Sequence, residues 1–176
     1  MIKRSYSWVR EPVDIRDIKF SSAIDAKKLS FKFSQRVNNP RIWDQGASSS
    51  CVAHAVNRLL AHKLIVTGAL NLDKSNRDEG TLSRAMTYYL ARWLGGNTRY
   101  DDGCYIRDGM KSLKNWGACS EKTLSYKPED FTESPSWYCY WKTLGKIINY
   151  RKLEISVNQI KQVIAENGCV VGGFYV

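Results

Sequence analysis

The sequence predicts a single-domain α+β fold, and three observations support this. Apolar residues recur at helical spacing in three stretches between residues 50 and 117, and again between 156 and 168. Each stretch ends at a glycine, a common residue just after a helix. The final run, CVVGGFYV, is apolar and typical of a strand. A chain of 176 residues can bury one core of ordinary size, so we expect one domain, with two lobes as the alternative.

The first predicted helix begins at about Ser50 and ends at Gly68, which places Cys51 in its first turn. Its apolar positions follow the pattern i, i+4, i+7 and i+8, so they share one face. The residues at those positions are Val52, Val56, Leu59 and Leu60. This helix bears on function because a side chain in a first turn lies beside unpaired backbone N–H groups.

Three further helices follow from the same pattern. The second is expected to begin with Thr81 as N-cap and to end at residues 95–96. The third covers residues 106–117. The fourth begins after Ser156 as N-cap and ends at Gly168.

Two long segments lack helical periodicity. Residues 1–40 mix polar and aromatic side chains, and we expect an extended leader that packs on the body formed by residues 41–176. Residues 120–141 are rich in aromatics and include two prolines, which indicates a loop packed onto the body.

Composition narrows the functional classes. A hydrophobic content of 43% favours a packed globule, and the sequence contains no apolar run near the ~18 residues of a membrane span. The five cysteines form no C-x-x-C pair, so we expect a reduced, cytoplasmic chain with no metal and no cofactor. The formal charge of +10 is spread from Lys3 to Lys161. A solvated basic surface explains it better than a nucleic-acid site, which would need a recognition motif as well.

The stretch DQGASSSCVAHAV suggests nucleophilic chemistry at Cys51. A helix amino terminus stabilises a thiolate, which is the attacking form of a cysteine. The Gln45 side-chain amide and the Cys51 backbone N–H could together stabilise a developing oxyanion, and the small serines between them leave room for a substrate. The alternative is a small buried thiol, a common fate of free cysteine.

Four blocks carry a resemblance to papain-like (C1 family) cysteine peptidases of the bacterial and viral type. WDQGASSSCVAHAV resembles their Q-G-x-x-x-S-C segment, with Gln45 at the oxyanion-hole glutamine and Cys51 at the nucleophile. EPVDIRDIKF resembles their leader motif, DDGCYIRDGMKSLKNWGACSE an internal stretch, and NGCVVGGFYV a strand. The resemblance thus covers nearly the whole chain, and it implies cysteine-type proteolysis.

The resemblance also implies a fold and a substrate loop. It predicts a complete helical (left) lobe with only the first part of the β-barrel (right) lobe, and therefore an open sheet edge. A protein partner or a second copy is expected to cover that edge. Ser48 stands where secreted members have a disulfide cysteine, which agrees with a reducing compartment. The predicted substrate-binding residues are Asp102, Gly103 and Cys104 along the substrate backbone, and Tyr105 and Ile106 in the pocket wall.

The catalytic histidine and asparagine of the resemblance are missing. They lie roughly 130–150 residues after the cysteine, whereas 125 residues follow Cys51 here. His54 and His62 both lie on the helix behind Cys51. A structural role suits both, with His54 as an improvised base the less favoured alternative. We therefore expect the histidine from another chain or from a missing carboxyl-terminal part.

Two functional hypotheses follow from these observations. The first is a papain-like thiol protease acting on a peptide or protein substrate. The second is a catalytically inactive papain-like binding or structural subunit of a larger assembly, for which a viral particle or an infected host cell is a fitting location. Nucleic-acid binding is the weakest reading, and no membrane association is expected.

Overall fold

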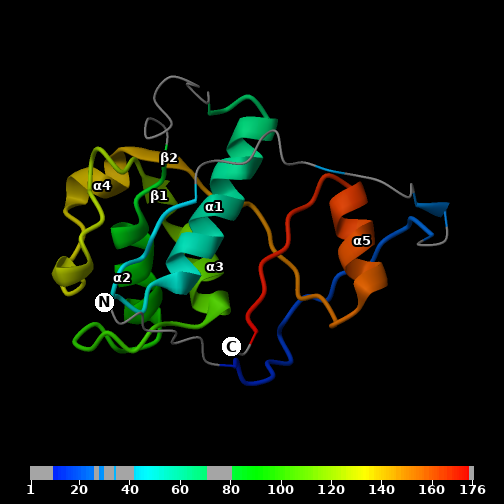
Figure 1. Ribbon diagram of the computed structural model, residues 1–176, viewed down its shortest axis with the longest axis horizontal. Coiled ribbons are helices and arrows are strands. Elements are labelled where there is room, and N and C mark those ends of the chain that lie inside the picture. Colours follow the sequence, from blue (N-terminus) through cyan, green and yellow to red (C-terminus); the bar gives the residue numbers. More distant parts are fainter. Residues whose placement is uncertain (1–9, 26–27, 30–33, 35–41, 71–80, 175–176) are drawn as a thin grey trace.

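The computed structural model describes residues 10–25, 28–29, 34, 42–70 and 81–174 (Figure 1). It has a mixed fold of helices with one small antiparallel sheet. The elements in chain order are α1 Cys51–Val66, α2 Arg84–Leu94, α3 Ile106–Asn115, β1 Ala118–Cys119, η3 Pro128–Asp130, α4 Trp137–Trp141, β2 Thr143–Gly145 and α5 Val157–Ala165. Helices α1, α2 and α3 lie together, while α5 stands apart on the far side of α1 (Figure 1).

Helix α1 begins at Cys51, as its periodicity predicts, and Ser50 is the N-cap residue. The Ser50 hydroxyl does not cap a backbone N–H of the helix. It pairs instead with the hydroxyl of Tyr126 and the ring of His54. One face of α1 is buried against α2 and α3. The first turn of α1 is therefore held from outside the helix.

Helix α2 begins later than the sequence predicts. Its N-cap is Ser83, whose hydroxyl accepts a hydrogen bond of 3.2 Å from the Met86 N–H. Thr81 was expected in this role, but Leu82 forms an antiparallel bridge with Ser120. The pairing keeps the backbone before Ser83 extended, so the helix cannot start at Thr81.

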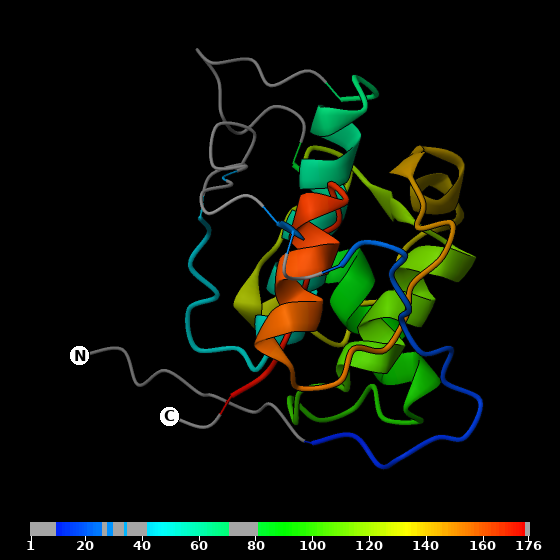
Figure 2. The ribbon, with the colours of Figure 1, turned by 90° about the vertical axis from the view of Figure 1, so that its right-hand side faces the viewer.

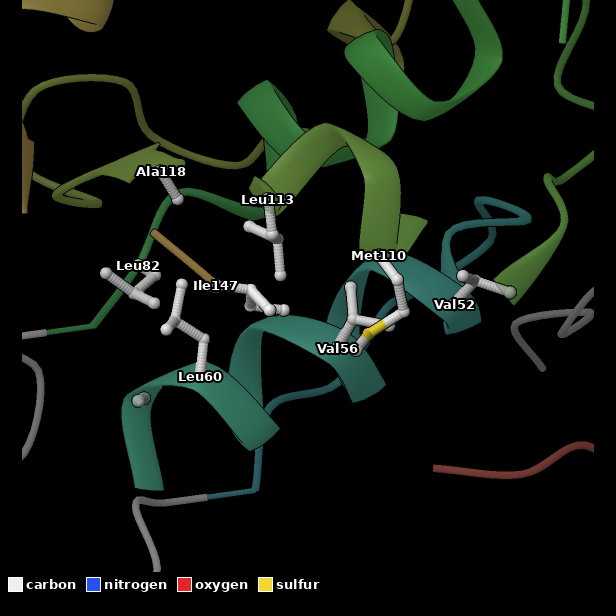
Figure 3. Close-up of a cluster of buried hydrophobic side chains, with 9 residues drawn as sticks. Val52, Val56, Leu60, Leu82, Met110, Leu113, Ala118 and Ile147 are labelled. Carbon is white, nitrogen blue, oxygen red and sulfur yellow. The ribbon is translucent and has the colours of Figure 1, made fainter. Parts of the chain in front are cut away.

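The main core lies between α1, α3 and the strands, as Figure 3 shows. Its buried members are Val52, Val56, Leu60, Ala61, Leu82, Met110, Leu113, Ala118 and Ile147. After α3 the chain turns at Gly117, whose φ of +75° favours glycine. A Cβ atom there would lie 2.4 Å from the Gly145 carbonyl oxygen, so β1 and β2 approach as closely as they do only because Gly117 has none.

Two other predictions need correction. Within residues 120–141, predicted as a loop, residues Trp137–Trp141 form the short helix α4 and bury Cys139. The strand was predicted over residues 169–176; of these, the described residues 169–174 have no regular secondary structure. A strand needs a neighbour to pair with, and among the described residues β1 and β2 pair with each other.

The described part of the leader contacts the body at several points. Lys152 pairs through its backbone with Ile18 and Phe20, with both hydrogen bonds at 2.9 Å. The Asp17 carboxylate binds the Arg107 guanidinium at 2.8 Å. The blue segment in Figure 1 continues from there to α5. The predicted boundary between leader and body, after residue 40, lies outside the described residues and stays a prediction.

Candidate active site

Cys51 is the first residue of α1 and its side chain is half-buried. It packs at the edge of the main core, and the three serines before it are almost fully buried. The thiol therefore lies at a helix amino terminus without being enclosed by the apolar interior.

Gln45 lies at the start of the loop formed by residues 45–50, which we call the nucleophile loop. Its Nε2 donates a hydrogen bond of 2.8 Å to the Ser48 carbonyl oxygen, so the amide faces its own loop. Gly46 has a φ of +63°, and its N–H donates to the Asp44 carboxylate at 3.0 Å. The turn places Gln45 and Cys51 on one short segment, while the oxyanion role of Gln45 stays a prediction.

Tyr126 holds both ends of the nucleophile loop. Its hydroxyl donates to the Gln45 carbonyl oxygen at 2.8 Å and lies 2.6 Å from the Ser50 hydroxyl. The Arg84 guanidinium lies 5.2 Å from the centre of the Tyr126 ring and forms an ion pair with Glu121. The sequence gives no local signal for this role, because Tyr126 is 76 residues away from Ser50.

Asp101, in the segment between α2 and α3, binds the middle of the same loop. Its two carboxylate oxygens accept hydrogen bonds of 3.1 and 3.0 Å from the Ser49 N–H, and one accepts from the Ser48 hydroxyl at 3.3 Å. The Tyr88 hydroxyl donates to the same carboxylate. Asp101 directly precedes the predicted substrate loop, but it was not among the site residues predicted from the sequence.

The predicted substrate loop begins with Asp102 and Gly103. The Asp102 carboxylate accepts a hydrogen bond of 3.0 Å from Asn97. Gly103 has a φ of +81°, and its N–H donates to the Tyr88 hydroxyl at 3.3 Å. The hydroxyl that binds Asp101 therefore also fixes the backbone of the substrate loop.

The remaining loop residues lie beside the nucleophile and the start of α3. Burial raises the pKa of the Cys104 thiol, and the neighbouring Cys51 raises it further. Both cysteines pack against the main core, as does Ile106. Tyr105 is the N-cap residue of α3 and lines an open cavity of about 450 Å³ together with Asp108. The structure thus brings the predicted loop close to Cys51, although its role in substrate binding is untested.

The two histidines lie on α1, where His54 is partly buried and His62 is buried. His54 Nδ1 lies 3.0 Å from the Ser50 carbonyl oxygen, and its ring meets Tyr126 edge to face at 4.8 Å. Burial lowers the pKa of His54 from 6.5 to about 4, with Arg84 contributing, so the ring is neutral near pH 7. His62 is buried farther along α1. These contacts place His54 on the side of α1 that faces Tyr126 and Arg84.

Two further properties of the described residues concern metal binding and membrane-spanning helices. No group of three or more histidine, cysteine, aspartate or glutamate side chains in the described residues could hold a metal ion. None of the helices in this part of the chain has both the length and the apolar character needed to cross a membrane.

Comparisons with known proteins agree with this architecture. No family model matches the chain. It is 25% identical to an uncharacterized peptidase C1-like protein of Acanthamoeba polyphaga mimivirus, across 99% of this chain and 62% of that protein. Its structure matches xylellain, a cysteine protease from Xylella fastidiosa, with a TM-score of 0.72 and 25% identity, across 93% of this chain and 64% of that chain. The chain thus spans less than two thirds of either relative. Its fold is papain-like, and its sequence is similar to that of a peptidase C1-like protein.

Proposed function

We propose that this chain forms the nucleophile-bearing part of a papain-like cysteine peptidase. The observation that carries the proposal is the position of Cys51, half-buried at the amino terminus of α1 and preceded by a loop held at both ends. A reactive thiol needs a stabilised thiolate and a fixed orientation. The papain-like fold and the C1-type relative support this assignment.

The proposed reaction is acyl transfer through Cys51. The thiolate attacks the carbonyl carbon of a peptide bond and forms a tetrahedral intermediate with a negatively charged oxygen. The Gln45 amide and the Cys51 backbone N–H donate hydrogen bonds to that oxygen. Collapse of the intermediate releases the amine, which takes a proton from a general acid, and water then hydrolyses the thioester.

The proton-transferring histidine of the proposed enzyme comes from outside these 176 residues, together with its asparagine partner. The reason is the environment of the two histidines present. The ring of His54 is neutral and bonded to Ser50, and His62 is buried farther along α1. A second polypeptide or further sequence of the same protein would supply the missing groups.

The proposed substrate is an extended peptide. Its backbone would pair with the loop containing Asp102, Gly103 and Cys104, and one of its side chains would lie against Tyr105 and Ile106. The left-handed backbone of Gly103 supports a close approach there, since glycine leaves room for a ligand's main chain.

A peptidyl epoxide probe tests the proposal. The full chain and any complex isolated with it are treated with the probe, and the modified residue is identified by mass spectrometry. We expect labelling at Cys51, with Cys51→Ser as the unlabelled control. Absence of labelling in both the chain and the complex would contradict a catalytic thiol.

A non-catalytic papain-like binding or structural subunit is the second candidate. Exposed apolar side chains late in the described chain, including Ile148 and Ile155, favour it. A partner that covers those side chains would explain them without catalysis. Cys51→Ala separates the two candidates, because it should abolish proteolysis but leave assembly with a partner unchanged.

A further inference from the structure

The nucleophile loop and the predicted substrate loop are joined by one buried polar network. Its centre is the Asp101 carboxylate, which binds the Ser49 N–H on one side and the Tyr88 hydroxyl on the other. The Tyr88 hydroxyl in turn accepts a hydrogen bond from the Gly103 N–H. The two loops are 52 residues apart in the sequence, yet only two side chains separate their backbones.

The burial of this network makes its hydrogen bonds costly to lose. Ser48 and Ser49 are each 2% exposed, and Tyr88 is equally buried. A buried N–H that loses its partner destabilises the fold, so the Ser49 backbone is strongly tied to the carboxylate. Burial, and then the neighbouring Asp101, raise the pKa of Tyr88, which keeps its hydroxyl protonated and able to donate.

Ser49 lies two residues before Cys51, so the position of its N–H sets how the chain enters α1. If the loop moved, the first turn of the helix would lose its fixed direction relative to the thiol. The stabilisation of a thiolate by a helix end falls off within one turn, so a small displacement has a large effect.

We propose that Asp101 is a positioning residue, which fixes the nucleophile loop ahead of Cys51 and, through Tyr88, aligns it with the substrate loop at Gly103. This inference rests on the proposed function, because it assigns a role toward a reactive Cys51 thiolate. Asp101 acts through Ser49 and Tyr88 and does not itself touch the reacting atoms.

The direction in which the reactivity of Cys51 changes when Asp101 is replaced distinguishes loss of positioning from loss of charge alone. Removing a negative charge near a thiol favours the thiolate, so charge loss alone would make Cys51 react faster at neutral pH. Loss of positioning would make it react more slowly, because the helix end no longer stabilises the thiolate. A purely structural role would instead expose the buried thiols of Cys119 and Cys139.

The experiment measures alkylation of each cysteine by iodoacetamide, from about pH 6 to about pH 9, with peptide-level mass spectrometry. It uses the full chain and needs no peptidase activity. Asp101→Asn and Asp101→Ala are compared with the wild type, with Tyr88→Phe, and with the chain unfolded in urea. Glu133→Gln removes the same charge from an exposed position and is the matched control.

We expect Cys51 alkylation at about pH 7 to slow roughly threefold in Asp101→Asn, which keeps one acceptor oxygen, and roughly tenfold in Asp101→Ala. The half-maximal pH should rise toward that of the unfolded chain in both variants and stay unchanged in Glu133→Gln. Tyr88→Phe should act in the same direction. Combined with Asp101→Asn, it should add little, since both changes break one network.

Two results would overturn the inference, and they differ in what else they imply. If Cys51 of the wild type has the pH profile of the unfolded chain, the reactive thiol itself is absent and the proposed function fails as well. If the wild-type profile is shifted but Asp101→Asn reacts at the same rate or faster, with Cys119 and Cys139 still protected, the positioning role alone is wrong.

Discussion

The described residues from 42 to 147 and those from 148 to 174 differ in how they bury apolar surface. The first region contains both core clusters and nearly all buried side chains. In the second region, Val163 is the one buried hydrophobic residue that the structure describes, and Ile148 and Ile155 are 92% and 102% exposed. Figure 1 shows α5, the helix of the second region, apart from α1, α2 and α3. Figure 2 views the molecule from the side on which α5 lies in front of α1.

The difference indicates which part of the chain can stabilise itself. Burial of apolar surface is the dominant stabilising term in folding, so the first region should carry most of the stability. The second region adds polar and partly buried contacts, such as Tyr150 and Val171 against the main core. The candidate nucleophile belongs to the first region, while the exposed side chains of Ile148 and Ile155 belong to the second.

The largest expected effect is in the main core. Leu113 lies on α3 and is fully buried in the main core, so Leu113→Ala should lower the free energy of unfolding by about 2–5 kcal/mol, because it removes packing and leaves a cavity. Urea denaturation followed by circular dichroism measures this. A loss below about 1 kcal/mol would show that the first region is not the stable part.

The next effect concerns pH. Burial lowers the pKa of His54 from 6.5 to about 4, so its neutral form stabilises the fold above pH 6.5. That contribution is lost as the pH falls from 6.5 toward about 4. Over this range His54 takes up a proton more readily in the unfolded chain than in the folded one, which favours unfolding. We expect a loss of roughly 3 kcal/mol over this interval.

His54→Gln provides the comparison for the pH effect. Urea denaturation at the two ends of the interval should show a smaller acid-induced loss in the variant than in the wild type. Equal losses would mean that other groups, such as the carboxylates of the leader, account for the acid sensitivity.

Tyr126→Phe should have a moderate effect. It removes only the hydroxyl that binds the Gln45 carbonyl and the Ser50 hydroxyl, and it keeps the ring against His54. We expect a loss of about 1–2 kcal/mol in unfolding free energy and slower alkylation of Cys51. Tyr138→Phe, at an exposed ring, is the control and should change neither quantity.

The smallest effect is expected at Ile155. Its side chain is fully exposed, so Ile155→Ser should change the unfolding free energy of the chain alone by less than about 0.5 kcal/mol. The same change should weaken a complex in which a partner covers this surface. Pull-down of the wild type and of Ile155→Ser side by side would show whether Ile155 lies at such an interface.

Local patterns predicted the helices well. The start of α1 at Cys51 and that of α3 at Ile106 agree with the structure, because helical periodicity is a property of neighbouring residues. The N-cap at Ser83 and the helix α4 were not predicted. The first depends on the pairing of Leu82 with Ser120, which is distant in the sequence, and the second on burial of Cys139 against other elements.

Only those residues of the candidate site that lie close together in the sequence were predicted. Cys51 and Gln45 lie on one segment, and a motif can reveal such a pair. Asp101 and Tyr126 reach the nucleophile loop from 52 and 76 residues away, and no spacing rule connects residues so far apart in sequence. The strand expected at residues 169–176 is not formed by the described residues 169–174 for a related reason, since strand formation needs a partner that a local pattern does not reveal.

Asp17 is the point where three segments of the chain are fastened electrostatically. Its carboxylate binds Arg107 at 2.8 Å and Lys152 at 2.9 Å, and Arg107 holds the pKa of Asp17 below its usual value. Dissolved ions weaken such attachments, since the Debye length shrinks from about 10 Å at 0.1 M to about 3 Å at 1 M salt. Apolar packing in the main core does not depend on charge. Ionic strength should therefore act as a selective solvent control that loosens residues 10–25 while the helices around Cys51 stay folded.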